Sequence, residues 1–241
     1  MDPTQATAVQ LSEFEQLAQR IRPTVLSAER TLPVAELYRP LFPMGGLVRG
    51  TRIAVEGAGA TSVAMSLLAP ASQAGSWVAV VGIGSWGWAA AVRAGIDRTR
   101  TVVIDDPPAS QWATAVAALV DSFDLVVVDP THQIGGVDAR RLAARTRERG
   151  SVVVSLQLAD QRRRFRWPTE PDHSLAVSTT AWTGLEVGHG YLQERRMSVA
   201  ATGRRGAVRE RRVEVCIDAQ GTLVAAAPER DATVRHLSRV S

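Results

Sequence analysis

The chain has 241 residues, of which 45% are hydrophobic and 22% charged, and its formal net charge is +4. This composition is typical of a soluble globular protein and excludes a disordered chain. No apolar run approaches the ~20 residues that a membrane-spanning helix needs, and the N-terminus lacks the basic and apolar regions of a signal peptide. All 28 basic residues are Arg, so a Schiff base, a lysine general base and a P-loop lysine are excluded.

Charge is divided unevenly along the chain. Residues 1–135 contain 9 Arg and 12 acidic residues, a net charge of −3, whereas residues 136–241 contain 19 Arg and 12 acidic residues, a net charge of +7. Such an excess favours an anionic partner for the later segments. A solvated Arg-rich surface would explain the same excess.

The cysteine and histidine content argues against disulfides and metal sites. Cys216 is the single cysteine, so no intrachain disulfide can form, and we expect a reducing, cytoplasmic location. The four histidines are scattered without ligand spacing. We therefore expect neither a metal nor a cofactor.

The predicted elements begin with an amphipathic helix near the N-terminus. Four apolar residues recur there at helical spacing: Leu11, Phe14, Leu17 and Ile21. Pro23 ends or kinks this helix. The apolar stripe is a candidate partner-binding surface; packing against its own domain is the alternative. A short helix and a Pro/Gly-rich approach follow.

Strands and helices then alternate. Five continuous aliphatic runs are predicted strands: 52–56, 77–81, 101–104, 124–129 and 151–157. Four predicted helices fit between them: 62–74, 87–95, 110–121 and 137–149. Continuous aliphatic strands indicate a sheet covered on both faces, and the alternation predicts a doubly wound, mainly parallel α/β sheet.

The character of the chain changes after residue 157. A polar, basic, Pro-containing loop comes first, followed by strand-like segments at 175–182, 195–201, 211–218 and 221–227 and a short tail. We predict that these segments are antiparallel strands that extend one edge of the sheet. The expected organisation is a helical extension (1–48), an α/β core (49–160) and a basic loop with an antiparallel β extension (161–241).

The segment VEGAGATSVAM, residues 55–65, lies where a P-loop of the form G-x-x-x-x-G-K-[ST] would join a strand to a helix. Counted from Gly57, the lysine position holds Val63 and the hydroxyl position holds Ala64. We interpret the segment as a tight strand-to-helix turn that has lost P-loop chemistry. Its candidate anion-binding residues are Gly57, Gly59, Thr61 and Ser62.

The segment RRRFRW combines cations with aromatic rings. It comprises Arg162, Arg163, Arg164, Phe165, Arg166 and Trp167. Phosphate neutralisation by Arg and base stacking on the rings suit single-stranded DNA, so these residues are DNA-binding candidates. A solvated loop whose arginines pair with Glu170 and Asp172 is the alternative.

The order of the segments resembles a RecA-type core. LYRPLFPMGGLVRGTRIAVEGAGATS resembles its approach to the P-loop strand, LVDSFDLVVVDP its Walker B strand, and RERGSVVVSLQ its following helix and strand. Over residues 32–160 the chain is similar to the ImuA family of RecA-like accessory proteins, specifically the actinobacterial ImuA-prime branch. A trailing pattern supports this likeness: Trp182, Gly184, Leu185, Arg195, Arg196, Arg211 and Arg212.

The resemblance carries some site residues over and leaves others out. Asp129 matches the Walker B position, and Gln157 matches the strand-end Gln that senses the γ-phosphate. The adenine-stacking position holds Ala90, and residues 78–96 contain no catalytic carboxylate. The resemblance therefore implies an accessory protein, not an enzyme, with a RecA-like fold.

The function implied by the resemblance is damage-induced (SOS) mutagenesis and translesion DNA synthesis. The implied partners are ImuB, a catalytically inactive Y-family polymerase homologue, an error-prone C-family DNA polymerase, and single-stranded DNA; self-association stays open. The implied location is the cytoplasm, on the nucleoid after DNA damage. Two alternatives are an ATPase with an aberrant P-loop, in which Arg52 or another Arg replaces the lysine, and a stand-alone module that binds single-stranded DNA.

Overall fold

The computed structural model describes residues 30–84, 86–105, 107–129, 134–157, 167–186, 189–203 and 209–226. Every element described below lies within residues 31–241. The predicted N-terminal helix with Leu11, Phe14, Leu17 and Ile21 lies outside the described residues, as does the predicted tail.

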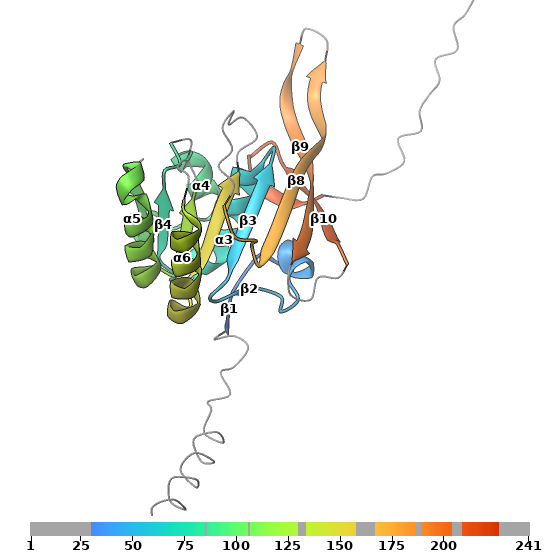
Figure 1. The fold of residues 1–241 in the computed structure, drawn as a ribbon. Helices are drawn as coiled ribbons and strands as arrows, with labels where there is room; N and C mark the ends of the chain where they lie inside the picture. The colour runs from blue at the N-terminus through green and yellow to red at the C-terminus, as the bar shows by residue number, and fades with distance from the viewer. Residues whose placement is uncertain are drawn as a thin grey trace, which may run out of the picture. The chain divides into compact units, whose positions relative to one another are not determined.

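A nine-stranded sheet forms the centre of the fold, with the order β11-β10-β9-β8-β3-β7-β6-β4-β5 (Figure 1). Its strands are β3 (Arg52–Gly57), β4 (Val78–Val81), β5 (Thr101–Ile104), β6 (Leu125–Val128), β7 (Val152–Gln157), β8 (His173–Glu186), β9 (His189–Gly203), β10 (Arg211–Ile217) and β11 (Leu223–Ala225). In this order, every pairing among β8, β3, β7, β6, β4 and β5 is parallel. The pairings β8–β9, β9–β10 and β10–β11 are antiparallel. The predicted doubly wound, mainly parallel sheet with antiparallel edge strands is confirmed.

Helices cover both faces of the sheet (Figure 1). They are the α-helices α3 (Ala60–Gln73), α4 (Trp88–Ala94), α5 (Ala109–Ser122) and α6 (Gly136–Arg149), with the 3-10 helices η1 (Glu36–Leu41) and η2 (Arg98–Arg100). A small second sheet pairs β1 (Thr31–Leu32) with β2 (Leu47–Val48). The predicted core helices all occur, with ends within two residues of their expected positions.

Strand alternation divides the apolar residues into two cores. On β3, Ile53 and Val55 belong to a core with α3, α4 and η1. On β7, Val153 belongs to the opposite core with α5 and α6. Both cores contain residues from β4, β6 and β7, and this is why those strands read as continuous aliphatic runs.

The β8–β9 hairpin corrects the prediction for the later strands. The sequence predicted two short strands, 175–182 and 195–201, in an antiparallel extension. In the structure β8 begins at His173 and β9 ends at Gly203. β8 pairs parallel with β3 on one edge through His173–Val177, and antiparallel with β9 on the other edge from His173 to Glu186. The polar ends of this hairpin lack the aliphatic runs that marked the core strands.

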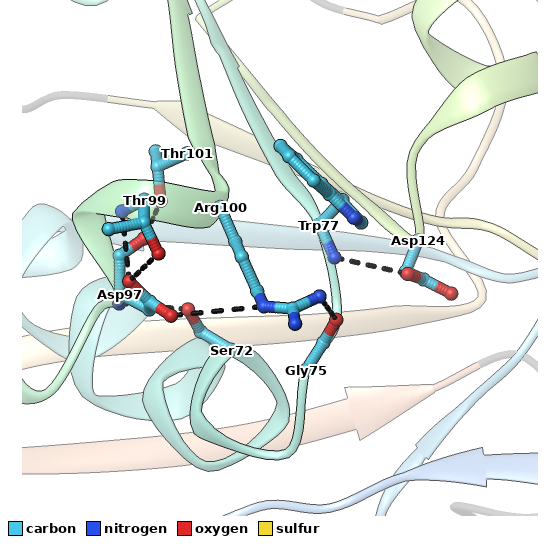
Figure 2. Close-up of polar contacts among 8 residues, drawn as sticks. All are labelled: Ser72, Gly75, Trp77, Asp97, Thr99, Arg100, Thr101 and Asp124. Atoms are coloured by element: carbon cyan, nitrogen blue, oxygen red, sulfur yellow. Dashed lines mark hydrogen bonds and ion pairs between the residues drawn. The ribbon is translucent and has the colours of Figure 1, made fainter.

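A polar cluster ties η2 to α3 and to the amino ends of β4 and β5 (Figure 2). Asp97 precedes η2 and accepts hydrogen bonds from the backbone N–H and the hydroxyl of Thr99, at 2.8 and 2.7 Å. Its own N–H donates to the Ser72 hydroxyl of α3 at 3.0 Å. Arg100 donates to the Gly75 carbonyl at 3.0 Å, and its guanidinium lies 3.9 Å from the Asp97 carboxylate. The hydrogen bonds from Thr99, followed by the charge of Arg100, hold the pKa of Asp97 below its usual value.

We expect Asp97→Asn to lower the free energy of unfolding near neutral pH and to lose this deficit in acid. Because the pKa of Asp97 is depressed in the folded chain, its ionised form stabilises the fold above the unfolded-state pKa of ~3.9. That contribution disappears as the pH falls through the lower folded-state pKa. Urea unfolding at pH about 7, 4 and 2.5 measures the difference. Equal differences at all three pH values would show that ionisation is not its cause.

Candidate functional site

The turn between β3 and α3 depends on two glycines with positive φ. Gly57 ends β3 with φ 103°, and Gly59 stands before the first helical residue with φ 108°. Residues with a Cβ rarely adopt this backbone region, whereas glycine does so at little cost. The sequence GAGA therefore produces a sharp strand-to-helix reversal at the carboxyl edge of the parallel strands.

The β8–β9 hairpin covers this turn at close range. A Cβ on Gly57 would collide with the backbone carbonyl oxygen of Val177, and a Cβ on Gly59 would lie 2.5 Å from the sulfur of Met197. The Thr179 hydroxyl lies 3.5 Å from the carbonyl oxygen of Ala58. In a P-loop the glycine backbone lies close to phosphate. Here the backbone of Gly57 and Gly59 lies close to β8 and β9 instead.

The lysine and hydroxyl positions of the P-loop pattern belong to the core. Val63 and Ala64 are both buried in the first turns of α3. Thr61 and Ser62 are half-buried in the first helical turn. Because the aliphatic side chains at 63 and 64 pack inward, neither position offers a group that could contact a phosphate or Mg²⁺.

Arg195 supplies a cation beside the turn. Its Nη2 atom lies 3.3 Å from the position that a Cβ on Gly59 would occupy. The guanidinium donates to the Thr179 hydroxyl through Nε at 3.1 Å and Nη2 at 2.7 Å, and it lies 4.7 Å from the ring centroid of Trp182. Burial lowers the pKa of Arg195. In the sequence this arginine stands out only as part of the trailing pattern, because its position beside Gly59 depends on the pairing of β9 with β8.

Arg52 occupies the opposite face of the sheet. Its guanidinium donates to the Ser155 hydroxyl at 3.3 Å and to the carbonyl oxygen of Thr169, and it lies 4.9 Å from the Trp167 ring. Burial lowers the pKa of Arg52 to about 10, an effect that the charge of Asp172 opposes. Arg52 therefore remains charged at neutral pH. Because its side chain lies on the face of the sheet opposite α3, it does not replace the P-loop lysine at the turn.

Asp129 follows the last residue of β6, and Gln157 is the last residue of β7, at the same edge of the sheet. Asp129 is buried, and its N–H donates to the Val81 carbonyl at 3.2 Å. Gln157 lies opposite Glu56 in the β3–β7 register, and both line a hollow with the loop at 167–171. This hollow also contains Arg52, so Gln157 lies on the Arg52 side and α3 packs on the other side.

Trp167 is a core residue, which corrects its predicted role in base stacking. Its side chain is 6% exposed and packs edge-on against Trp112 of α5 at a ring-centroid distance of 5.9 Å. With Arg52 against its ring, neither face is open to a nucleobase. The other DNA-binding candidates, Arg162, Arg163, Arg164, Phe165 and Arg166, lie outside the described residues.

We expect Gly57→Ala to destabilise the fold by about 2–4 kcal/mol, because it combines an unfavourable φ with a backbone collision at Val177. Gly84→Ala is the matched control, since a Cβ there meets nothing within 4 Å. Chemical denaturation of both variants measures the effect. Equal stability of the two would refute the close contact between the turn and β8.

We expect Trp167→Ala to cost about 3–5 kcal/mol of stability, as large-to-small changes at buried aromatic residues do. Trp182→Ala, at a side chain that is 50% exposed, should cost less than ~1 kcal/mol. Thermal or urea unfolding compares the two variants. A loss of less than ~1 kcal/mol for Trp167→Ala would show that this side chain is not buried.

Comparison with known proteins places the chain in a family. Residues 40–164 match the family described as the MT3502 N-terminal domain. The uncharacterized protein Rv3395c of Mycobacterium tuberculosis is 36% identical over 97 residues, which are 40% of this chain and 47% of that protein. The match thus spans about half the length of this relative.

Solved structures identify the fold. The crystal structure of the RadB recombinase superposes with a TM-score of 0.55 at 15% sequence identity, covering 80% of this chain and 98% of that chain. No helix in the described residues is long and apolar enough to cross a membrane. The α/β fold is RecA-like, and since the family match covers more than half of its residues, this chain belongs to the MT3502 N-terminal domain family.

Proposed function

We propose that this chain is a non-catalytic RecA-fold accessory protein that acts in damage-induced mutagenesis and translesion DNA synthesis. The observation that carries the proposal is the packing of the β3–α3 turn: Gly57 and Gly59 lie directly against β8 and β9. Val63 and Ala64, at the lysine and hydroxyl positions, are buried in the core. A turn packed in this way holds β3, α3 and the β8–β9 hairpin together.

The chemistry of phosphoryl transfer supports the absence of turnover. Transfer depends on positioning and on charge neutralisation by a lysine, Mg²⁺ and an arginine. The whole chain contains no lysine. The segment from the end of β4 to the start of α4, residues 82–87, contains no carboxylate that could orient an attacking water. Several contributions to catalysis are therefore missing together.

The partners follow from the resemblance to the ImuA-prime branch. They are ImuB, the error-prone C-family polymerase and single-stranded DNA. An accessory protein of this kind would act by holding these partners together, and its activity would depend on exposed surfaces instead of a reaction centre. The excess of positive charge in residues 136–241 suits contact with DNA.

Nucleotide binding is the second candidate, and Arg195 is the specific observation that favours it. Its guanidinium lies beside Gly59 at the N-terminal end of α3, where backbone N–H groups favour anions. A bound nucleotide would use Arg195 in place of the lysine. Hydrolysis would still lack the Mg²⁺ hydroxyl and the carboxylate.

We expect Gln157→Ala to restore damage-induced mutation in a strain that lacks this chain, to within about twofold of the wild-type chain, because an accessory protein without turnover needs no γ-phosphate sensor. The measurement is the frequency of drug-resistant mutants after ultraviolet irradiation. Co-purification of ImuB with the wild-type and Gln157→Ala chains is the control for assembly. Loss of mutagenesis in a variant that still folds and binds ImuB would contradict the proposal.

Nucleotide addition to the purified chain separates the two candidates. ATP or ADP with Mg²⁺ at millimolar concentration should shift the melting temperature by less than about 1 °C, whereas a ligand at 100 times its Kd adds ~2.7 kcal/mol. A shift of several degrees that Arg195→Gln removes and Arg52→Gln retains would favour the nucleotide-binding candidate.

A further inference from the structure

The distal part of the β8–β9 hairpin is an arm without neighbouring strands. β3 pairs with β8 only as far as Val177, and β10 pairs with β9 only from Arg195 onward. Within the described residues, 178–186 therefore pair with no strand except β9, and 189–194 pair with no strand except β8. We call these residues the arm. Figure 1 shows the arm continuing past the ends of the other strands. A two-stranded ribbon has no core of its own, so exposed side chains on its faces can contact a partner.

Two aromatic residues, Trp182 and Tyr191, belong to the arm, and the register places Trp182 on the same face as Arg195. Trp182 pairs with Arg195, and Thr179 pairs with Met197, so these pairs share a face. Gln193 and Tyr191 precede Arg195 at alternate positions of β9, in a stretch where the register with β8 shifts between Thr183 and Leu185. This face continues the core surface of Val177 and Val199, on the side of the sheet that α3 covers.

The two aromatic side chains of the arm are exposed. Trp182 is 50% exposed and Tyr191 is 88% exposed. Arg195 stacks over the Trp182 ring and bonds to the Thr179 hydroxyl. Among the described side chains, no carboxylate makes an ion pair with Arg195, so its charge is available to an anion.

The opposite face of the ribbon has a different chemistry. Arg196 is paired there with Glu194 at 2.9 Å, which cancels its charge within the chain. The ion pair of Arg196 and Glu194 therefore lies on one face of the ribbon, and Arg195 lies beside the Trp182 ring on the other face. A cation next to exposed rings is complementary to a phosphate next to a base.

We propose that the arm binds single-stranded nucleic acid, with bases stacked on Trp182 and Tyr191 and a phosphate contacted by Arg195. The proposal rests on the function proposed above, for which it names a DNA-contacting element apart from the basic loop at 162–166. Stacking on rings and contact with one phosphate predict binding that tolerates many base sequences. A protein partner would instead be expected to offer a carboxylate to Arg195. The test below distinguishes such a partner from nucleic acid.

The test is fluorescence anisotropy of a labelled oligo-dT of about 20 nucleotides, longer than a typical single-strand site, with the purified full chain. We expect the double variant Trp182→Ala/Tyr191→Ala to weaken binding by at least about tenfold, since each lost stacking partner lowers affinity severalfold or more. Trp88→Ala, at a tryptophan of α4 that is 41% exposed, is the matched control and should bind like the wild type. Circular dichroism and melting confirm that each variant folds.

The charge contribution is measured through salt dependence. Arg195→Gln should reduce the slope of log K against log salt by ~0.7, the value for one phosphate of a single strand. Arg196→Gln, on the opposite face of the same strand, should leave the slope unchanged. Equal slopes for the wild type and Arg195→Gln would overturn the assignment of Arg195.

Failure of this inference differs from failure of the proposed function. A wild-type chain that binds no oligo-dT, or a double variant that binds like the wild type, overturns the arm as a DNA site. Either result leaves ImuB co-purification and the mutagenesis measurement untouched. Loss of ImuB co-purification in the double variant, with DNA binding unchanged, would assign the arm to a protein partner and overturn the inference as well.

Discussion

The contact between the β3–α3 turn and the β8–β9 hairpin is the constraint on which the other features depend. Gly57 and Gly59 must have positive φ and no Cβ, because Val177 and Met197 occupy the space that a side chain would need. This contact fixes β8 beside β3 through His173–Val177. Once β8 is held there, β9 follows by antiparallel pairing, and Arg195 at the base of the arm lies beside Gly59, which precedes α3.

The same contact explains how a nucleotide-binding pattern can persist in part. In a P-loop the glycines let the backbone approach phosphate, and here they let it approach two strands. Close packing against β8 and β9 requires glycine at positions 57 and 59. It does not require a lysine or a hydroxyl at positions 63 and 64, where Val63 and Ala64 are buried in the core. A partial motif is thus compatible with selection on the fold alone.

The sequence predicted the parallel part of the sheet well because β3, β4, β6 and β7 are buried on both faces and read as aliphatic runs. It did not predict the length of β8 and β9, since an arm without a core has no apolar periodicity to mark its ends. Trp167 was predicted to bind DNA because it follows four arginines and a phenylalanine in the sequence. In the structure it packs on Trp112, a residue 55 positions earlier in the chain. Arg195 was missed as a site residue because its position beside Gly59 depends on strand register.

The two faces of the sheet give two arginines opposite roles, although both stack on tryptophan. Arg52 is buried beside Trp167, and its guanidinium donates to Ser155 and Thr169 within the fold. Arg195 lies on a half-exposed ring and bonds to one hydroxyl, so part of its guanidinium can still face a ligand. A planar guanidinium can stack on a ring and keep its in-plane donors free, whereas a lysine ammonium cannot. In a chain whose cations are all arginine, exposed tryptophan next to arginine is therefore where stacking and phosphate contact can occur together.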